Sequence, residues 1–116
     1  MKKFLALAVC VVAIGCGDDS TTDTPPDNNA RATTIAALTG VAADGQIIYD
    51  QVCSVCHGPA GAGTAAGNSL VDSTKTKAEV IGSLLNGITG TTMVSYSSRT
   101  DQEIADLTAY TLAFQP

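Results

Sequence analysis

The residues in this chain best suited to chemistry are Cys53, Cys56 and His57, in the stretch Cys53-Ser54-Val55-Cys56-His57. Two thiols three positions apart can each form a thioether with one vinyl group of a haem. The imidazole that follows can bind the iron from one side. His57 is also the only histidine of the chain. The spacing therefore predicts one haem c, covalently attached through Cys53 and Cys56, with His57 as an iron ligand.

Three other interpretations of this stretch remain open from the residues alone. A zinc site needs four ligands, and no second pair of Cys or His follows His57. A thioredoxin-like redox motif would lie at a strand-to-helix junction, and the pattern of strands is absent. A structural disulfide between Cys53 and Cys56 would make the chain a non-haem binding module, but it would leave His57 without a role.

The first residues have the features of an export signal. Two lysines precede an apolar run over residues 4–14, which is too short to span a bilayer but has the length of a signal h-region. The run ends Ala13-Ile14-Gly15-Cys16, which resembles the lipobox of bacterial lipoproteins, although leucine is commoner three positions before the cysteine.

Ordinary signal cleavage at the same bond is the alternative to lipidation. After cleavage, Cys16 would be an unpaired thiol in an oxidising compartment, because Cys10 leaves with the signal and haem takes the other two cysteines. We therefore predict that residues 1–15 are a signal peptide. Lipid on Cys16 would then hold the exported chain on a membrane, at its periplasmic or other extracytoplasmic face.

The charge of the chain limits its partners. The net charge is −5, with six Lys and Arg against eleven Asp and Glu. A surface that binds nucleic acid needs a basic patch, so we expect no nucleic-acid partner. Without residues 1–15, four basic residues face all eleven acidic ones, a side-chain charge of about −7. Redox partner proteins with basic docking surfaces are expected.

Composition divides the chain after the signal into two parts. Residues 16–34 are polar, small or proline apart from Cys16, which predicts a disordered tether behind the lipidated cysteine. Residues 35–116 should form the folded domain. Its first helix is expected over residues 43–55, with Asp44 as its cap and Gly45 at a crossing with a second helix. The apolar positions that recur at helical spacing are Ile47, Ile48, Val52 and Val55.

Two capping boxes predict the remaining helices. Thr76 to Glu79 opens one that should end at Gly87, and Thr100 to Glu103 opens the last one. The expected buried positions are Val80, Ile81, Leu84 and Leu85 in the first, and Ile104, Leu107, Tyr110, Thr111 and Phe114 in the second. A loop over residues 88–99 carries Met93, and a glycine-rich loop over residues 58–67 is expected against the cofactor. The domain is therefore predicted to be all-α.

Residues 41–114 resemble the small class I (monohaem) c-type cytochromes of bacteria. The pieces that carry the resemblance are Gly45 and Tyr49 ahead of Cys53-x-x-Cys56-His57, then Gly58-x-x-Gly61-x-Gly63, Asn86-Gly87-Ile88 before a methionine, and a last helix with Leu107 and Tyr110. The resemblance implies the cytochrome c fold, three to four short helices around one covalently bound haem. It also implies that the first and last helices cross beside the haem.

The resemblance further implies the iron ligands. The proximal ligand corresponds to His57, and the distal ligand to Met93, for which a flexible core filler is the alternative role. Where family members often have a Gly-Pro whose carbonyl accepts a hydrogen bond from the histidine, this chain has Gly67-Asn68, and the Asn68 carbonyl could serve. Where they often have a proline after the methionine, this chain has Val94, so the methionine loop is expected to be less rigid.

With both axial positions filled, the iron has no open site for a substrate. This predicts a membrane-tethered carrier of single electrons and not an enzyme. A haem-based redox or gas sensor, or a small peroxidase, is the alternative if Met93 dissociates. A cytochrome subunit of a larger oxidoreductase is another. Rapid binding of carbon monoxide to the reduced protein would favour the sensor or peroxidase.

Overall fold

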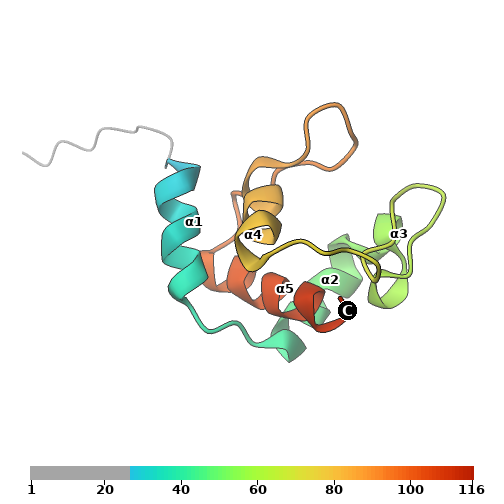
Figure 1. Ribbon diagram of the computed structural model, residues 1–116, viewed down its shortest axis with the longest axis horizontal. Coiled ribbons are helices and arrows are strands. Elements are labelled where there is room, and N and C mark those ends of the chain that lie inside the picture. Colours follow the sequence, from blue (N-terminus) through green and yellow to red (C-terminus); the bar gives the residue numbers. More distant parts are fainter. Residues whose placement is uncertain (1–26) are drawn as a thin grey trace, which may run out of the picture.

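The computed structural model describes residues 27–116 of the chain, and Figure 1 shows their arrangement. The elements are α1 (Asn28–Ala37), α2 (Ala42–Val52), α3 (Ser54–His57), the short 3₁₀ helix η1 (Pro59–Gly61), α4 (Lys77–Asn86) and α5 (Asp101–Ala113). Apart from one isolated bridge between Thr64 and Gly67, these residues form no β-structure. The predicted all-α fold is therefore confirmed.

The crossing of α2 and α5 is the most extensive helix contact in the described part of the chain. Gly45 lies at this crossing, and a Cβ atom there would collide with the backbone carbonyl of Asp106. The predicted role of Gly45 is therefore confirmed. The start of α2 differs from the prediction: Asp44 lies in its first turn and does not cap it. The Asp106 carboxylate on α5 accepts a hydrogen bond from the Val41 N–H instead, at 2.8 Å.

Three aromatic rings join the far ends of α2 and α5. Tyr49 makes edge-to-face contacts with Tyr110 and Phe114, with ring centroids 5.2 and 5.8 Å apart. The Tyr49 hydroxyl donates a hydrogen bond to the Gly58 carbonyl at 2.9 Å, directly after the residue motif that ends at His57. Burial raises the pKa of Tyr49 to about 12, so the phenol stays protonated as a donor.

The helical spacing of apolar residues predicted that Ile47 and Val55 lie on the buried side of the first helix, and this is wrong. Ile47 is 59% exposed and Val55 is 75% exposed, so neither belongs to the core. The helix expected over residues 43–55 is interrupted at Cys53, after which the short helix α3 begins. A single helical stripe through residue 55 could not describe this break.

Helices α4 and α5 begin as predicted, and α4 also ends as predicted. Both capping boxes form: Thr76 with Glu79 opens α4, and Thr100 with Glu103 opens α5. Gly87 ends α4 with a φ of +67°, a conformation that glycine adopts without strain. The four predicted apolar residues of α4 are buried, as are Ile104 and Leu107 of α5. Tyr110, Thr111 and Phe114 are half-buried.

Helix α1 corrects the predicted tether. Residues 28–34 are not part of a disordered segment, because they form most of α1. The Asp27 side chain accepts the Asn29 N–H at 3.0 Å, and Ile35 is fully buried where α1 packs on α4 and α5. At its other end, the Lys77 ammonium donates to the carbonyls of Ala36 and Leu38, at 2.8 and 3.1 Å. These tertiary contacts stabilise a helix that composition alone does not reveal.

The predicted signal peptide, Cys16 and residues 17–26 of the predicted tether lie outside the described residues. Within residues 27–116, no helix has both the length and the apolar character needed to cross a bilayer.

Candidate functional site

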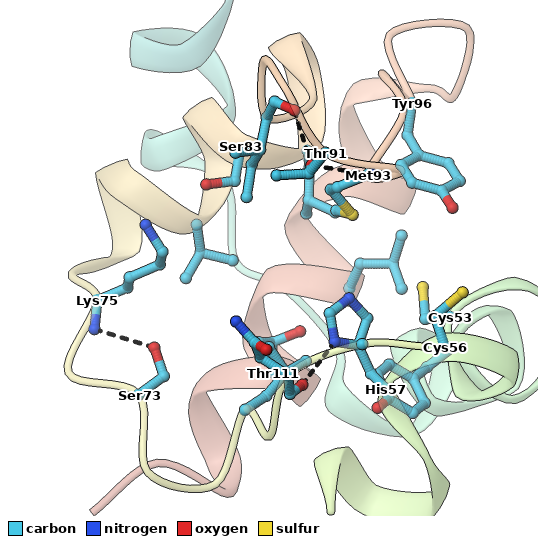
Figure 2. A pocket seen from close by; sticks show the side chains of 18 of the residues that line it. Cys53, Cys56, His57, Ser73, Lys75, Ser83, Thr91, Met93, Tyr96 and Thr111 are labelled. Atoms are coloured by element: carbon cyan, nitrogen blue, oxygen red, sulfur yellow. Dashed lines mark hydrogen bonds between the residues drawn. The ribbon is translucent and has the colours of Figure 1, made fainter. Parts of the chain in front are cut away.

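A cavity of about 300 Å³ lies between α2 and α3, α5, α4 and the loop after α4. Its wall is mostly apolar, with contributions from Val52, Leu70, Val80, Leu84, Ile88 and Leu107. Figure 2 shows that side chains from segments far apart in the sequence converge on this cavity. Cys53, Cys56, His57 and Met93, the four predicted haem-binding residues, all line it. The predicted lipidation residue, Cys16, lies outside the described residues.

Local helix geometry places the two cysteines on one side of the cavity. The N–H of Cys53 donates to the Tyr49 carbonyl at 2.8 Å, which ends α2, and the N–H of His57 donates to the Cys53 carbonyl at 2.9 Å, which forms α3. The two sulfur atoms lie near each other at one edge of the cavity, and the imidazole projects from the same short helix (Figure 2). The stretch from Cys53 to His57, whose spacing predicted haem attachment, therefore forms a single helical turn.

The proton of His57 is fixed by its hydrogen bond. Nδ1 lies 2.9 Å from the backbone carbonyl of Asn68. A carbonyl oxygen can only accept, so Nδ1 carries the proton and Nε2 keeps a free lone pair. Figure 2 shows the second ring nitrogen directed across the cavity toward Met93. The prediction that the Asn68 carbonyl can hold the histidine is confirmed.

Gly67 allows this carbonyl to come close. A Cβ atom at Gly67 would lie 2.6 Å from the Cys56 carbonyl oxygen, so a side chain there would push the Gly67-Asn68 backbone away from His57. The glycine-rich loop thus approaches the histidine side of the cavity, as expected from its composition.

Met93 faces His57 from the opposite side of the cavity. Its N–H donates to the Thr91 hydroxyl at 3.1 Å, and its carbonyl accepts the Ile88 N–H at 3.0 Å, which closes a tight loop. The side chain is half-buried, and its sulfur points into the cavity (Figure 2). A neutral imidazole nitrogen and a thioether sulfur therefore face the same space from two sides.

The chemistry of the two thiols weighs against two of the alternative sites. Cys53 and Cys56 are both free and make no disulfide. Burial raises the pKa of the Cys53 thiol to about 11, with Arg99 opposing the shift in part, so this thiol is protonated at neutral pH. In residues 27–116 no three His, Cys, Asp or Glu side chains are grouped so as to hold a metal ion. The lack of further ligands in residues 27–116 weighs against a zinc site, and the protonated Cys53 thiol weighs against a reactive thiolate.

The sequence offered Lys75, Lys77 and Arg99 as possible partners of the haem carboxylates, and the structure shows which of them lies at the cavity. Ser73, Lys75, Ser83 and Thr91 line the side away from the cysteines, and Lys75 is the only basic residue of the lining (Figure 2). The other three Lys and Arg residues of residues 27–116 have different partners: Arg31 pairs with Asp101 at 2.7 Å, Lys77 binds the end of α1, and Arg99 pairs with Glu103 at 3.1 Å. Because isolated surface charges are usually only solvated, the sequence offered no signal that would separate Lys75 from Lys77.

This lining fits a haem. The macrocycle is apolar and flat, with its vinyl groups on one side and its carboxylates on the other. The cavity offers apolar walls, two thiols at one edge and hydroxyl and ammonium groups at the other. The two side chains that could bind iron approach from its two faces.

Comparison with known proteins agrees with this geometry. Residues 40–110 match the family described as "Cytochrome C oxidase, cbb3-type, subunit III". The match covers more than half of the chain and includes the cysteine pair, the methionine loop and most of α5. No curated protein matches the chain, and no solved structure does. A cytochrome c domain carries a covalently bound haem c and serves haem-based electron transfer. The chain therefore belongs to this family and is a monohaem c-type cytochrome.

Proposed function

We propose that this protein is an exported, membrane-tethered electron carrier whose haem is attached through Cys53 and Cys56 and ligated by His57 and Met93. The observation that carries the proposal is the cavity in which the His57 ring and the Met93 sulfur face each other beside two free thiols. When bound, the haem iron supplies a one-electron change between the ferric and ferrous states.

The chain's own residues set the conditions for that change. The Asn68 carbonyl keeps the proton of His57 on Nδ1, so Nε2 is available to the iron and the ring orientation is fixed. The Met93 thioether is a soft, neutral ligand that favours ferrous over ferric iron. The apolar wall acts in the same direction, because it disfavours the additional positive charge of the ferric state.

The polar edge of the cavity is where the haem carboxylates belong. The Lys75 ammonium supplies the positive charge, and the hydroxyls of Ser73, Ser83 and Thr91 can donate hydrogen bonds. A positive charge in this position also raises the reduction potential, because it disfavours the oxidised state.

The tether and the location rest on the N-terminal sequence. The apolar run over residues 4–14 and the cysteine at position 16 support export and lipidation on Cys16. A lipid on Cys16 would keep the domain at a membrane, with residues 17–26 between the lipid and α1, the first helix of the domain. The acidic charge of the chain supports redox partners with basic docking surfaces.

A second candidate is a cytochrome subunit of a larger oxidoreductase. The description of the matched family, which names subunit III of a cytochrome c oxidase, favours it. In that case the same haem would pass electrons within an assembly. Purification from native membranes separates the two candidates, because a subunit co-purifies with fixed partners in mild detergent and a carrier elutes alone.

The test of the carrier proposal is the spectrum of protein matured with haem-attachment factors. We expect covalent haem absorbance and the weak far-red band of a sulfur–ferric iron bond. Met93→Leu should remove that band and shift the midpoint potential by an amount on the order of 0.1 V, within the ~0.8 V range that axial ligands span. Thr92→Ala, at a neighbouring residue of the lining, should change neither.

Two results would contradict the proposal. Colourless protein after correct maturation would exclude the haem site. A Met93→Leu variant with unchanged spectrum and potential would exclude Met93 as the ligand, and rapid carbon monoxide binding by the reduced wild type would then favour a sensor or peroxidase.

A further inference from the structure

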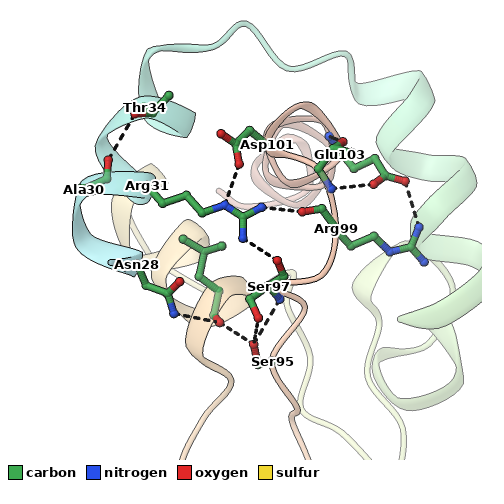
Figure 3. A network of polar contacts seen from close by, with 11 residues as sticks. Asn28, Ala30, Arg31, Thr34, Ser95, Ser97, Arg99, Asp101 and Glu103 are labelled. Carbon is green, nitrogen blue, oxygen red and sulfur yellow. Dashed lines mark hydrogen bonds and ion pairs between the residues drawn. The ribbon is translucent and has the colours of Figure 1, made fainter. Parts of the chain in front are cut away.

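Helix α1 lies outside the residues that match the family and contacts the segment that follows Met93. The contact is made by Arg31, whose guanidinium binds three groups at once (Figure 3). Nε lies 2.7 Å from the Asp101 carboxylate, and the two terminal nitrogens donate to the carbonyls of Ser97 and Arg99, both at 2.5 Å. The Arg31 side chain is only 13% exposed.

The same segment is also bound to the end of α4. The Tyr96 N–H donates to the Leu84 carbonyl at 2.7 Å, and the Ser95 hydroxyl donates to the Leu85 carbonyl at 2.6 Å. Residues 95–99 are therefore held between α4 on one side and α1 on the other. In contrast, the hydrogen bonds of residues 88–93 stay within the loop.

These contacts bear directly on the position of the Met93 sulfur. Met93 is followed by Val94, which leaves the backbone free to rotate, so the rigidity of the loop must come from its anchors. The planar guanidinium stays charged at every relevant pH and can bind several acceptors in a fixed geometry, which one ammonium group cannot reproduce.

We propose that α1 acts as a strap on the methionine loop, with Arg31 as the positioning residue that keeps the Met93 sulfur facing His57. The proposal rests on the His57 and Met93 ligation put forward above. Arg31 touches neither the haem pocket nor the reacting atoms, and acts through the backbone carbonyls of Ser97 and Arg99.

The test uses the full-length, haem-loaded protein. As the pH is raised, the far-red sulfur band of Arg31→Ala should disappear at a pH at least one unit lower than the pH at which the wild type loses it. Its reduced form should bind carbon monoxide at least tenfold faster at pH 7. Arg31→Lys, which keeps the charge but not the fork, should give intermediate values and remains informative if Arg31→Ala does not fold.

Two control variants separate loop positioning from general stability. Thr34→Ala changes a residue on the same helix whose hydroxyl bonds only to the Ala30 carbonyl of its own helix, at 3.3 Å. Phe114→Leu loosens the packing against the rings of Tyr49 and Tyr110 at the end of α5 opposite to Asp101, 15 residues after Arg99 in sequence. Both controls should keep the wild-type band and carbon monoxide rate. Arg31 variants that match the controls in both measurements overturn the proposal.

Hydrogen exchange tests whether α1 holds the methionine loop independently of whether Met93 binds the iron. In Arg31→Ala, the amides of residues 95–99 should exchange at least tenfold faster than in Thr34→Ala. If Met93→Leu leaves the wild-type spectrum unchanged, the proposed ligation fails and the role of Arg31 toward the iron fails with it. Exchange then decides alone whether α1 holds the loop, and unchanged exchange rejects the strap.

Discussion

The two sides of the cavity are built in different ways. The histidine side is local: Cys53, Cys56 and His57 occupy one turn, and the carbonyl that holds His57 is 11 residues away. The methionine side is assembled from distant parts, because Arg31 reaches carbonyls 66 and 68 residues later in the chain. Local geometry persists as long as its helix does, whereas a loop held by remote contacts opens with any of them. We therefore expect the histidine side to be robust and the methionine side to be adjustable.

The largest effect is expected from removing the attachment on the histidine side. Replacing both Cys53 and Cys56 by alanine should abolish haem that survives denaturation, because no thioether can form. Haem staining after denaturing electrophoresis measures this directly. Ser54→Ala, between the two cysteines, removes only a hydroxyl that bonds to the Asp50 carbonyl at 2.9 Å and should keep full staining. Covalent haem in the double variant would mean that other residues attach it.

The second-largest effect on the histidine side is expected from a substitution at the crossing of α2 and α5. Gly45→Ala places a methyl group against the Asp106 carbonyl and should lower the free energy of unfolding by about 3 kcal/mol, at the upper end of overpacking costs. Gly82→Ala in α4 meets no atom within 4 Å and should raise it by about 0.5–1 kcal/mol. Denaturant unfolding of the two holoproteins measures both. If Gly45→Ala and Gly82→Ala change the free energy of unfolding equally, the crossing of α2 and α5 is not close-packed.

Substitutions of Lys75 and Lys77, two positions apart, should affect different properties: the first the midpoint potential, the second the stability of the fold. Lys75→Gln removes the positive charge from the polar edge of the cavity and should lower the midpoint by on the order of 20 mV, a third of the ~59 mV that a tenfold change in a one-electron equilibrium represents. Lys77→Gln breaks the contacts with the end of α1 and should lower stability instead. Redox titration and denaturant unfolding of both variants test this, and identical behaviour would remove the special role of Lys75.

The smallest effects concern the two capping boxes and their dependence on pH. The Thr100 backbone N–H and Arg99 hold the pKa of Glu103 below its ordinary value of 4.5, and Thr76 does the same for Glu79. A depressed pKa stabilises the fold at pH values above the ordinary one. The contribution is lost as the pH falls through the folded-state pKa.

Glu103→Gln and Glu79→Gln should therefore be less stable than the wild type at pH 7. The difference should close as the pH falls below about 4.5. Only Glu103→Gln should also speed carbon monoxide binding, because its partner Arg99 belongs to the segment after Met93. An equal change in both variants would mean that the end of the methionine loop is no more sensitive than the start of α4.

Local signals predicted most of the fold. The capping boxes at Thr76 and Thr100 depend on residues three positions apart, and the structure contains both. The contact of His57 with the Asn68 carbonyl was expected from the resemblance to c-type cytochromes, because Gly67-Asn68 stands where family members often have Gly-Pro, and the structure contains it. The exposure of Val55 was not predicted, since the break of the helix at Cys53 leaves no periodic signal. The exposure of Ile47 was not predicted either, because its spacing from the other apolar residues of α2 places it on their stripe.

Helix α1 and Arg31 escaped prediction for a different reason. The segment from Asn28 to Thr34 has the small, polar composition of a disordered region, and its stability comes from contacts with residues near position 100. Such pairings leave no periodic pattern in a single sequence. The sequence could not choose among Lys75, Lys77 and Arg99 as partners of the haem carboxylates, because only the folded chain shows that Lys75 lines the cavity.

The size of the cavity has a consequence for how the protein accumulates in a cell. The cavity of about 300 Å³ is mostly apolar and partly open to solvent, so without the cofactor its lining side chains face water instead of packing against an apolar group. We therefore expect the polypeptide alone to be less stable than the haem-loaded protein, and proteases remove chains that never receive their cofactor. We expect the steady-state amount of this protein to follow the supply of haem more closely than the supply of its messenger RNA.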